Sequence, residues 1–167
     1  MESKTVTDDA LDAIDWRILA ELQTDAAQAN QDLAARVHVS PATCLRRVRR
    51  LVESGLVQRR VALLDPEPLG PLLQVLCEVT LDRQGLEHLD AYEALVLAHP
   101  AVQQCYRVSP GPDLVLVAVT RDMASWSRVV AELFTQQANV RNIKTFFVLK
   151  RSKFDPAWPL RGPADGL

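Results

Sequence analysis

The chain has 167 residues, of which 48% are hydrophobic and 24% charged, and its formal net charge at pH 7 is -2. This length is sufficient for two small domains with modest cores, and the overall charge gives no sign of nucleic-acid binding. The three cysteines are widely spaced without a Cys-x-x-Cys pair, which argues against disulfides and a zinc site, and no apolar run reaches the roughly 20 residues that span a membrane.

The amino-terminal segment predicts two short helices. In the first, apolar residues recur at helical spacing behind a cap at Asp12: Leu11, Ile14, Ile18 and Leu22. The pattern resumes over residues 31–37, with Asn30 as the expected cap. Only His38 and Val39 separate this second helix from the next capping residue, so the segment predicts a helix-turn-helix, whose second helix reads DNA.

The segment 40–57 predicts that second helix, with one apolar and one arginine-rich side. Ser40 suits its N-cap, Pro41 its first position, and Gly55 the left-handed turn that ends it. At about 100° per residue the apolar side contains Cys44, Leu45, Val48, Leu51 and Val52. The other side contains Thr43, Arg46 and Arg50, flanked by Arg47 and Arg49. Such a helix either enters a DNA major groove or presents solvated arginines, and the helix-turn-helix context favours DNA.

Basic residues are concentrated around this helix. Between positions 36 and 60 they are opposed by Glu53 alone: Arg36, Arg46, Arg47, Arg49, Arg50, Arg59 and Arg60. A local patch matters more than the total charge because phosphate attraction is screened over about 8–10 Å.

We expect DNA contacts from the start of the helix, at Ser40 and Pro41, and along its cationic side. Thr43, Arg46 and Arg50 are expected at base edges or nearby phosphates, and Arg49, Arg59 and Arg60 at the DNA backbone. Arg47 either joins these contacts or braces the helix through Asp15, and bracing is favoured. The loosely alternating segment 56–64 is expected to be a wing or a strand that leaves the domain.

The second half predicts a four-stranded α+β domain. Alternation and apolar runs predict strands over residues 72–81, 102–109, 114–119 and 140–150. Helical spacing predicts helices over residues 85–98 and around 123–133, the latter capped by Asp122. The order βαββαβ is that of a ferredoxin-like fold.

This arrangement leaves one sheet face without helices, because right-handed crossovers place both helices on the same side. The third predicted strand is continuously apolar, and Leu76, Phe146 and Val148 add to an exposed apolar surface. Such a surface usually marks an interface, so we expect two sheets to meet in a homodimer. A charge at Leu116 is expected to dissociate this dimer if its side chain faces the partner.

Several motifs, in order, resemble those of the Lrp/AsnC family of prokaryotic transcription regulators. They are Leu11-Asp12-x-Ile14-Asp15-x-x-Ile18-Leu19, Leu33-Ala34, Val39-Ser40-Pro41, Arg47-Val48-x-Arg50-Leu51 and Gly55-Leu56-Val57, followed by a hinge-like segment over residues 61–70. The resemblance implies an amino-terminal winged helix-turn-helix and a carboxy-terminal domain that dimerises, binds a small amino acid and assembles dimers into octamers.

The resemblance also implies an effector site, although this sequence departs from the family pattern there. The family's Gly-Asp-x-Asp turn corresponds here to residues 108–113, where Asp113 aligns with the second aspartate and Gly111 lies one place late. Thr145 matches a family threonine in the fourth strand, and Ser109 is in the candidate set but is interpreted as a strand-end residue rather than a ligand contact. Pro110 and Pro112 remove N–H groups that would hold a ligand carboxylate. Asp113 either pairs with an α-ammonium group or caps the turn without a ligand, so effector identity and retention stay open.

The predicted organisation is a winged helix-turn-helix over residues 8–64, a hinge over 65–71, a ferredoxin-like domain over 72–153 and a flexible tail over 154–167. The predicted function is that of a cytoplasmic, sequence-specific DNA-binding regulator responsive to a small amino acid, with no cofactor, metal or enzymatic activity. The alternative is a metabolite-binding oligomeric module in which DNA binding is secondary or lost. RNA binding through the sheet is a third option, disfavoured because the sheet lacks aromatic pairs for base stacking.

Overall fold

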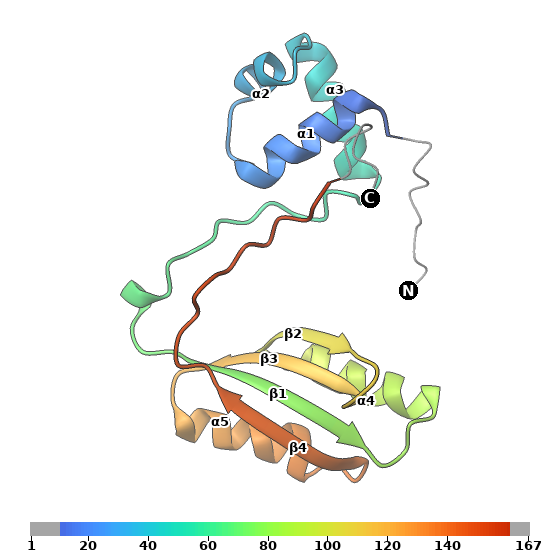
Figure 1. Ribbon diagram of the computed structural model, residues 1–167, viewed down its shortest axis with the longest axis vertical. Helices are drawn as coiled ribbons and strands as arrows, with labels where there is room; N and C mark the ends of the chain where they lie inside the picture. The colour runs from blue at the N-terminus through green and yellow to red at the C-terminus, as the bar shows by residue number, and fades with distance from the viewer. Residues whose placement is uncertain (1–10, 161–167) are drawn as a thin grey trace. The chain divides into compact units, whose positions relative to one another are not determined.

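A computed structural model describes residues 11–160 of the chain (Figure 1). The chain divides into two compact units: the first comprises the chain up to Leu63 together with the segment from Phe154, and the second comprises Leu64–Lys153. The start of the first predicted domain, residues 8–10, and the end of the predicted tail, residues 161–167, lie outside the described residues. Within residues 11–160, no helix combines the length and apolar character needed to cross a membrane.

Three helices build the amino-terminal unit: α1 (Ala13–Thr24), α2 (Asn30–Arg36) and α3 (Pro41–Glu53). Their buried apolar side chains form one small core: Ile18, Leu19, Leu33, Ala34, Val37, Cys44, Val48 and Leu51. The apolar sides predicted for these helices supply this core. Leu45 and Val52 lie at the edge of the α3 stripe and stay 40% and 45% exposed.

The start of α1 is held by a capping box, as its sequence predicts. The Asp12 carboxylate accepts hydrogen bonds from the N–H groups of Ile14 and Asp15, at 2.9 and 3.0 Å. The Asp15 carboxylate accepts from the Asp12 N–H at 3.2 Å, so two otherwise unpaired donors are satisfied reciprocally.

The starts of the other two helices depend on different contacts. Ser40 caps α3 by accepting a hydrogen bond from the Thr43 N–H, and Pro41 is the first helical residue, as predicted. The predicted cap at Asn30 is wrong. Ala29 occupies the N-cap position of α2, and the Asn30 side chain donates to the Pro41 carbonyl at 2.9 Å. Asn30 therefore ties α2 to the start of α3.

The turn between α2 and α3 is a Schellman motif centred on His38. The His38 N–H donates to the Ala35 carbonyl and the Val39 N–H to the Ala34 carbonyl, the bond pattern that defines this motif. His38 has a φ of 59°, a left-handed conformation in which glycine is usual. Gly55, with a φ of 81°, follows the end of α3 as predicted. The two turns fix how α3 enters and leaves the unit.

Residues 54–72, all described, contain no strand, so the wing expected over residues 56–64 is not formed within this chain. A single 3-10 turn, Glu67–Leu69, interrupts an irregular and mostly exposed segment. The Val57 N–H bonds to the Leu51 carbonyl, which ties the segment to the end of α3. A strand requires a neighbouring strand for its N–H and C=O groups, and within residues 11–160 no strand pairs with this segment.

Four antiparallel strands form the sheet of the second unit: β1 (Leu73–Leu81), β2 (Val102–Arg107), β3 (Leu114–Thr120) and β4 (Val140–Phe147). Their order is β2-β3-β1-β4. Helix α4 (Leu86–Ala98) follows β1, and α5 (Met123–Val130), extended by a π-helical turn over Ala131–Thr135, follows β3. Both helices cover the same sheet face (Figure 1). The predicted ferredoxin-like order is therefore confirmed, although β2 and β4 end earlier than expected.

The two sheet faces have different environments. Alternate strand residues pack against α4 and α5 in one core: Val75, Cys77, Val79, Leu81, Leu114, Leu116 and Ala118. Leu116 is 1% exposed in this core, so its side chain does not face a partner and the condition of the expectation built on it is not met. On the open face, Leu76 lies between Val117 and Phe146 in the strand register. Leu76 and Phe146 are 39% and 49% exposed, so the open face is partly apolar.

The tail differs from expectation over its described part, residues 154–160. The Trp158 N–H donates to the Gln23 side-chain carbonyl at 2.7 Å, and the Gln23 side-chain amide donates to the Trp158 carbonyl at 3.0 Å. Leu160 packs against the core of the amino-terminal helices. The sequence indicated flexibility because this segment is rich in proline and glycine. In the structure, the side-chain amide of Gln23 on α1 forms hydrogen bonds to the backbone of Trp158 and fixes this part of the segment.

Candidate DNA-binding and effector sites

Helix α3 presents Arg46 and Arg49 to solvent, away from its buried residues. Cys44, Val48 and Leu51 anchor the helix in the core and fix its rotation. Arg46 and Arg49 are exposed, and within residues 11–160 neither forms an ion pair. These two guanidinium groups are therefore available to an anionic partner.

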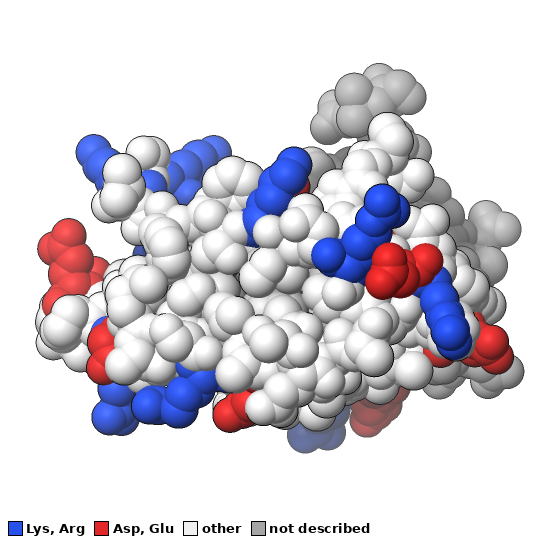
Figure 2. Space-filling model, turned by 90° about the horizontal axis from the view of Figure 1, so that it is seen from below, with Lys and Arg blue, Asp and Glu red and all other residues white. Residues whose placement is uncertain are grey.

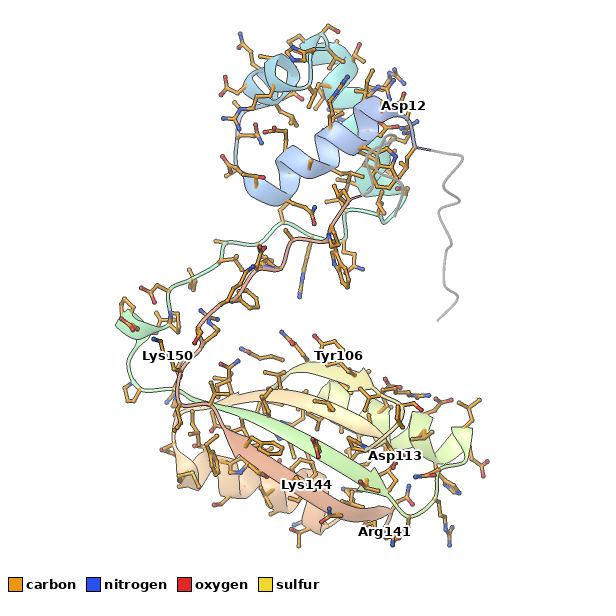
Figure 3. The ribbon with its side chains drawn as sticks, in the orientation of Figure 1. Asp12, Tyr106, Asp113, Arg141, Lys144 and Lys150 are labelled. Carbon is orange, nitrogen blue, oxygen red and sulfur yellow. The ribbon has the colours of Figure 1, made fainter. Side chains whose placement is uncertain are left out.

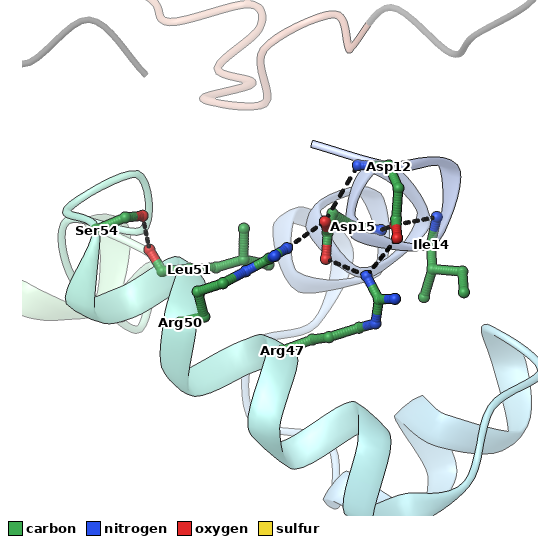
Figure 4. A network of polar contacts seen from close by, with 7 residues as sticks. All are labelled: Asp12, Ile14, Asp15, Arg47, Arg50, Leu51 and Ser54. Carbon is green, nitrogen blue, oxygen red and sulfur yellow. Dashed lines mark hydrogen bonds and ion pairs between the residues drawn. The ribbon is translucent and has the colours of Figure 1, made fainter. Parts of the chain in front are cut away.

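The other two arginines of the cluster converge on Asp15, which α1 contributes (Figure 4). One Asp15 oxygen, Oδ1, lies 2.9 Å from Nη1 of Arg47, and the other, Oδ2, is paired with Nη2 of Arg50. Nη1 of Arg47 also lies 2.7 Å from Oδ2 of Asp12. The four side chains form one network that connects the first turn of α1 to the middle of α3.

Burial sets the strength of this network. The Asp15 side chain is 1% exposed and that of Arg47 15%, whereas those of Arg50 and Asp12 are 50% and 52% exposed. The hydrogen bond to Asp15, followed by the one to Asp12, raises the pKa of the Arg47 guanidinium. The pKa of Asp12 is lowered, chiefly by the hydrogen bond from the Asp15 N–H and also by Arg47. Asp15 is a buried charge, so its arginine partners offset its desolvation.

This geometry divides the residues predicted to contact DNA. Arg47 makes the Asp15 contact that the sequence favoured. Arg50 was expected at base edges or phosphates; it is paired with the same carboxylate while its side chain stays 50% exposed, and its contact with DNA stays a prediction. The Ser40 hydroxyl donates to the Thr43 hydroxyl at 2.9 Å, so both side chains belong to the α3 cap. Arg59 and Arg60 lie in the exposed segment after α3.

The predicted effector residues do not form one cluster. Ser109 precedes a cis peptide bond to Pro110, and Gly111 has a φ of 131°. The Asp113 carboxylate accepts the Leu81 N–H at 2.7 Å, and its own N–H donates to the Val79 carbonyl at 2.9 Å. Asp113 thus fastens the β2–β3 connection to the end of β1, which matches the turn-capping alternative.

Thr145 lies on the helix-covered side of the sheet, away from the open face. It is opposite Cys77 in the strand register, and its hydroxyl lies 4.0 Å from the Cys77 sulfur. The neighbouring Lys144 points to the open face instead. Thr145 and Gly111 therefore do not line one site within the chain.

A small cavity on the open face lies beside the β2–β3 connection. It has a volume of about 200 Å³ and is lined by Glu78, Thr80, Gly111, Pro112, Asn142 and Lys144. Nζ of Lys144 lies 3.6 Å from Oε2 of Glu78, so the cavity contains both a cation and an anion. Figure 3 shows Lys144 on β4 and Asp113 at the same end of the sheet. The predicted effector residues did not include these strand residues. Alternation in β1 nevertheless places Glu78 and Thr80 on the open face of the sheet, whereas Cys77 points to the helix-covered face.

A larger depression lies at the other end of the sheet. Its volume is about 870 Å³, and its charged lining residues have both signs: Arg121, Arg128, Asp122 and Glu132. The His99 ring there contacts Glu132 at 3.2 Å. None of the residues predicted to bind DNA or an effector lines this depression, which is wide and open.

The cysteines are structural. Desolvation raises the pKa of the Cys77 thiol to about 11, and burial also raises the pKa of Cys44 and Cys105. All three are free thiols. Because the thiolate is the reactive form, none is poised as a nucleophile at neutral pH.

Surface charge is unevenly distributed. In the view of Figure 2, uncharged residues occupy most of the visible face, and basic and acidic side chains alternate around its edge. This face has no continuous cationic area of the kind that binds phosphates.

Two family models match the two units of the chain. The model described as Lrp/AsnC ligand binding domain matches residues 74–158. The model described as winged helix-turn-helix DNA-binding matches residues 11–58. Together they cover α1 to α3 and all of the sheet except Leu73, the first residue of β1.

Curated relatives match over nearly the full chain. The leucine-responsive regulatory protein of Rhizobium meliloti is 38% identical over 143 residues, which are 86% of this chain and 92% of that protein. The leucine-responsive regulatory protein of Escherichia coli K12 is 34% identical over 153 residues, which are 92% of this chain and 93% of that protein.

Solved structures also match over most of the chain. A transcriptional regulator from Neisseria meningitidis, in complex with L-Met, matches with a TM-score of 0.80 and 32% identity over 90% of this chain and 97% of that chain. A feast or famine regulatory protein from M. tuberculosis, complexed with L-methionine, matches with a TM-score of 0.79 and 28% identity over 89% of this chain and 99% of that chain.

Proposed function

The chain belongs to the Lrp/AsnC family of transcriptional regulators, and we propose that α3 enters the major groove of its operator. Arg46 and Arg49 are the arginines of this helix that contact DNA. The observation that carries this proposal is the division of the arginine cluster. Arg46 and Arg49 are exposed and unpaired within residues 11–160, whereas Arg47 and Arg50 are paired with Asp15. The planar guanidinium group of arginine can form two hydrogen bonds to a guanine edge or a phosphate. The two unpaired arginines are therefore suited to contact DNA.

Other DNA contacts follow from the position of α3. The N-terminal end of a helix carries unpaired N–H groups and favours anions, so the Ser40–Thr43 turn is suited to a phosphate. Arg59 and Arg60 follow α3 in an exposed segment and are suited to the adjacent backbone. These contacts position α3, and Arg46 and Arg49 carry the base readout.

We propose that the carboxy-terminal unit binds an α-amino acid at the open-face cavity, as an effector. Lys144 and Glu78 there offer a cation for the carboxylate and an anion for the ammonium group. The two structural relatives with bound methionine support this ligand class. Asp113 acts by holding the β2–β3 connection beside the cavity, and Ser109 and Thr145 have no direct role in the proposed site.

We propose that two copies pair through their open sheet faces and that such dimers assemble further, up to an octamer, in the cytoplasm. The exposed side chains of Leu76, Phe146 and Tyr106 support this pairing, since they leave apolar surface on a face that no helix covers. A twofold dimer presents two α3 helices to a palindromic site.

Binding to duplex DNA across a salt series tests the proposal. The wild-type affinity is expected to fall steeply with salt, and Arg46→Ala is expected to weaken operator binding by about 1–3 kcal/mol. Arg121→Ala, an exposed arginine of the carboxy-terminal unit, is the matched control and is expected to retain affinity. An Arg46→Ala variant with unchanged operator affinity contradicts the assignment.

The second candidate function, a metabolite-binding module, has a distinct outcome. It requires that a folded wild-type chain bind amino acids but show no salt-dependent affinity for duplex DNA. The cavity with Lys144 and Glu78 is the observation in its favour.

A further inference from the structure

Asp15 is a buried acidic residue whose role is not explained by helix capping alone. Its side chain is 1% exposed, and both of its oxygens are used. Oδ1 accepts from Arg47, and Oδ2 accepts from Arg50 and from the Asp12 N–H. A capping box needs only the last of these bonds, so the two arginine contacts require another explanation.

The contacts reach from α1 to the helix that the proposed function places in the groove. Arg47 and Arg50 are one turn apart on α3 and straddle the same carboxylate (Figure 4). Their pairing fixes α3 against α1. It also compensates the charges of two of the four clustered arginines, of which Arg47 is largely buried and Arg50 stays half exposed.

We infer that Asp15 is a specificity-determining positioning residue: it withholds Arg47 and Arg50 from DNA phosphates and leaves base readout to Arg46 and Arg49. This inference rests on the proposed function. Non-specific affinity increases with the number of phosphates that a protein neutralises, whereas sequence discrimination depends on base contacts. Withholding two arginines therefore lowers non-specific binding more than operator binding and raises the ratio between them.

The variant Asp15→Asn tests this inference. The amide keeps the size of the side chain and one acceptor, but it loses the charge. Arg47 retains Asp12 as a partner, whereas Arg50, already half exposed, loses its only ion-pair partner among residues 11–160. Arg50 then reaches phosphates, so the salt slope for non-specific DNA is expected to steepen by about 0.9, equivalent to about an eightfold gain in affinity at 0.1 M salt. The ratio of operator to non-specific affinity is expected to fall accordingly.

Two further variants separate positioning from charge. Glu53→Gln is the matched control, because Glu53 is an exposed acidic residue of α3 and its loss changes the net charge by the same amount. It is expected to raise operator and non-specific affinity equally and to leave their ratio unchanged. The double variant Asp15→Asn with Arg50→Met removes the released arginine and is expected to return the non-specific salt slope to that of the wild type.

A measurement on the wild-type chain covers the case in which Asp15→Asn does not fold. Guanidinium NMR signals are followed while non-specific duplex DNA is added. The signals of Arg46 and Arg49 are expected to shift, and those of Arg47 and Arg50 to stay in place. A shift of the Arg50 signal equal to that of Arg46 overturns the inference.

The outcomes distinguish this inference from the function on which it rests. A wild-type chain without salt-dependent DNA binding overturns the proposed function. A wild-type chain that binds, together with an Asp15→Asn variant of unchanged slope and ratio, overturns only the role of Asp15. An equal loss of both affinities in Asp15→Asn also overturns it, because that result describes a residue needed for folding alone.

Discussion

At the residue scale, Asp12 links the first turn of α1 to α3 through one carboxylate. It accepts the N–H groups of Ile14 and Asp15, and it contacts Arg47. Asn is about as effective as Asp at an N-cap, but it does not titrate. The two contributions of Asp12, capping and charge, are therefore separable by substitution.

The first prediction concerns acid stability. The folded-state pKa of Asp12 is lowered, chiefly by the Asp15 N–H. The resulting stabilisation is present above the unfolded-state pKa of about 3.9 and is lost as pH falls through the folded-state pKa. In urea denaturation from pH 7 to pH 3, Asp12→Asn is expected to lose less stability than the wild type. Asp12→Ala removes the cap as well and is expected to cost about 1 kcal/mol at pH 7. Identical acid sensitivity of Asp12→Asn and the wild type contradicts this assignment.

The second prediction concerns the left-handed residue of the helix-turn-helix. His38 has a φ of 59°, which costs a non-glycine residue about 1–2 kcal/mol, while glycine at that position adds unfolded-state entropy. His38→Gly is therefore expected to raise the free energy of unfolding by up to about 1 kcal/mol. His38→Ala, which keeps a Cβ, is expected to bring no gain. Chemical denaturation measures both, and a destabilised glycine variant is the contrary result.

At the element scale, each strand of the sheet separates a core face from an open face. Leu116 and Leu76 illustrate this, since they lie on the neighbouring strands β3 and β1. Leu116 is 1% exposed beneath the helices, and Leu76 is 39% exposed on the other side. The same chemical change at the two positions is therefore expected to have different consequences.

The third prediction compares a charge on the two faces. Leu76→Asp is expected to leave the carboxy-terminal unit folded and to dissociate the proposed dimer, because it places a charge in an apolar interface. Leu116→Asp is expected to cost about 3 kcal/mol or more of stability, because an unpaired charge enters the core. Light scattering gives the mass, and circular dichroism gives the fold. A Leu76→Asp variant with the mass of the parent protein argues against pairing through this face.

At the scale of the whole molecule, the chain passes between its two units twice. It leaves the amino-terminal unit after α3 and returns to it with the segment from Phe154. Gln23 receives that segment through two hydrogen bonds to the Trp158 backbone. The helices of the amino-terminal unit are therefore connected to the rest of the chain by two segments, the one that follows α3 and the one from Phe154.

The fourth prediction concerns this attachment. Gln23→Ala is expected to lower the stability of the amino-terminal unit by about 1 kcal/mol, the usual net value of the bonds it loses. Deletion of residues 154–167 is expected to cost more, because it also removes Leu160 from the core. Hydrogen exchange of the α1 amides reports both effects. Gln103→Ala, an exposed glutamine of β2, is the control, and unchanged α1 protection after the deletion contradicts the attachment.

Local signals in the sequence predict the helices and strands and their order. Caps at Asp12 and Ser40, the glycine after α3 and the alternation in β1 are local signals, and local hydrogen bonding and side-chain periodicity are what they encode. The sequence motifs also correctly predicted the family to which the chain belongs. The cap at Asn30 was mispredicted because a tertiary contact to Pro41 takes its side chain.

Which groups are available to a partner depends on contacts that form between distant segments on folding. Arg46, Arg47, Arg49 and Arg50 have the same chemistry in one short run, yet Asp15, more than 30 residues earlier, engages two of them. Tertiary packing likewise places Leu116 on the helix-covered face of the sheet. It also brings the Gln23 side chain to the backbone of the tail. Periodicity specifies which residues share a face, but ion pairs and packing form between segments that only folding brings together.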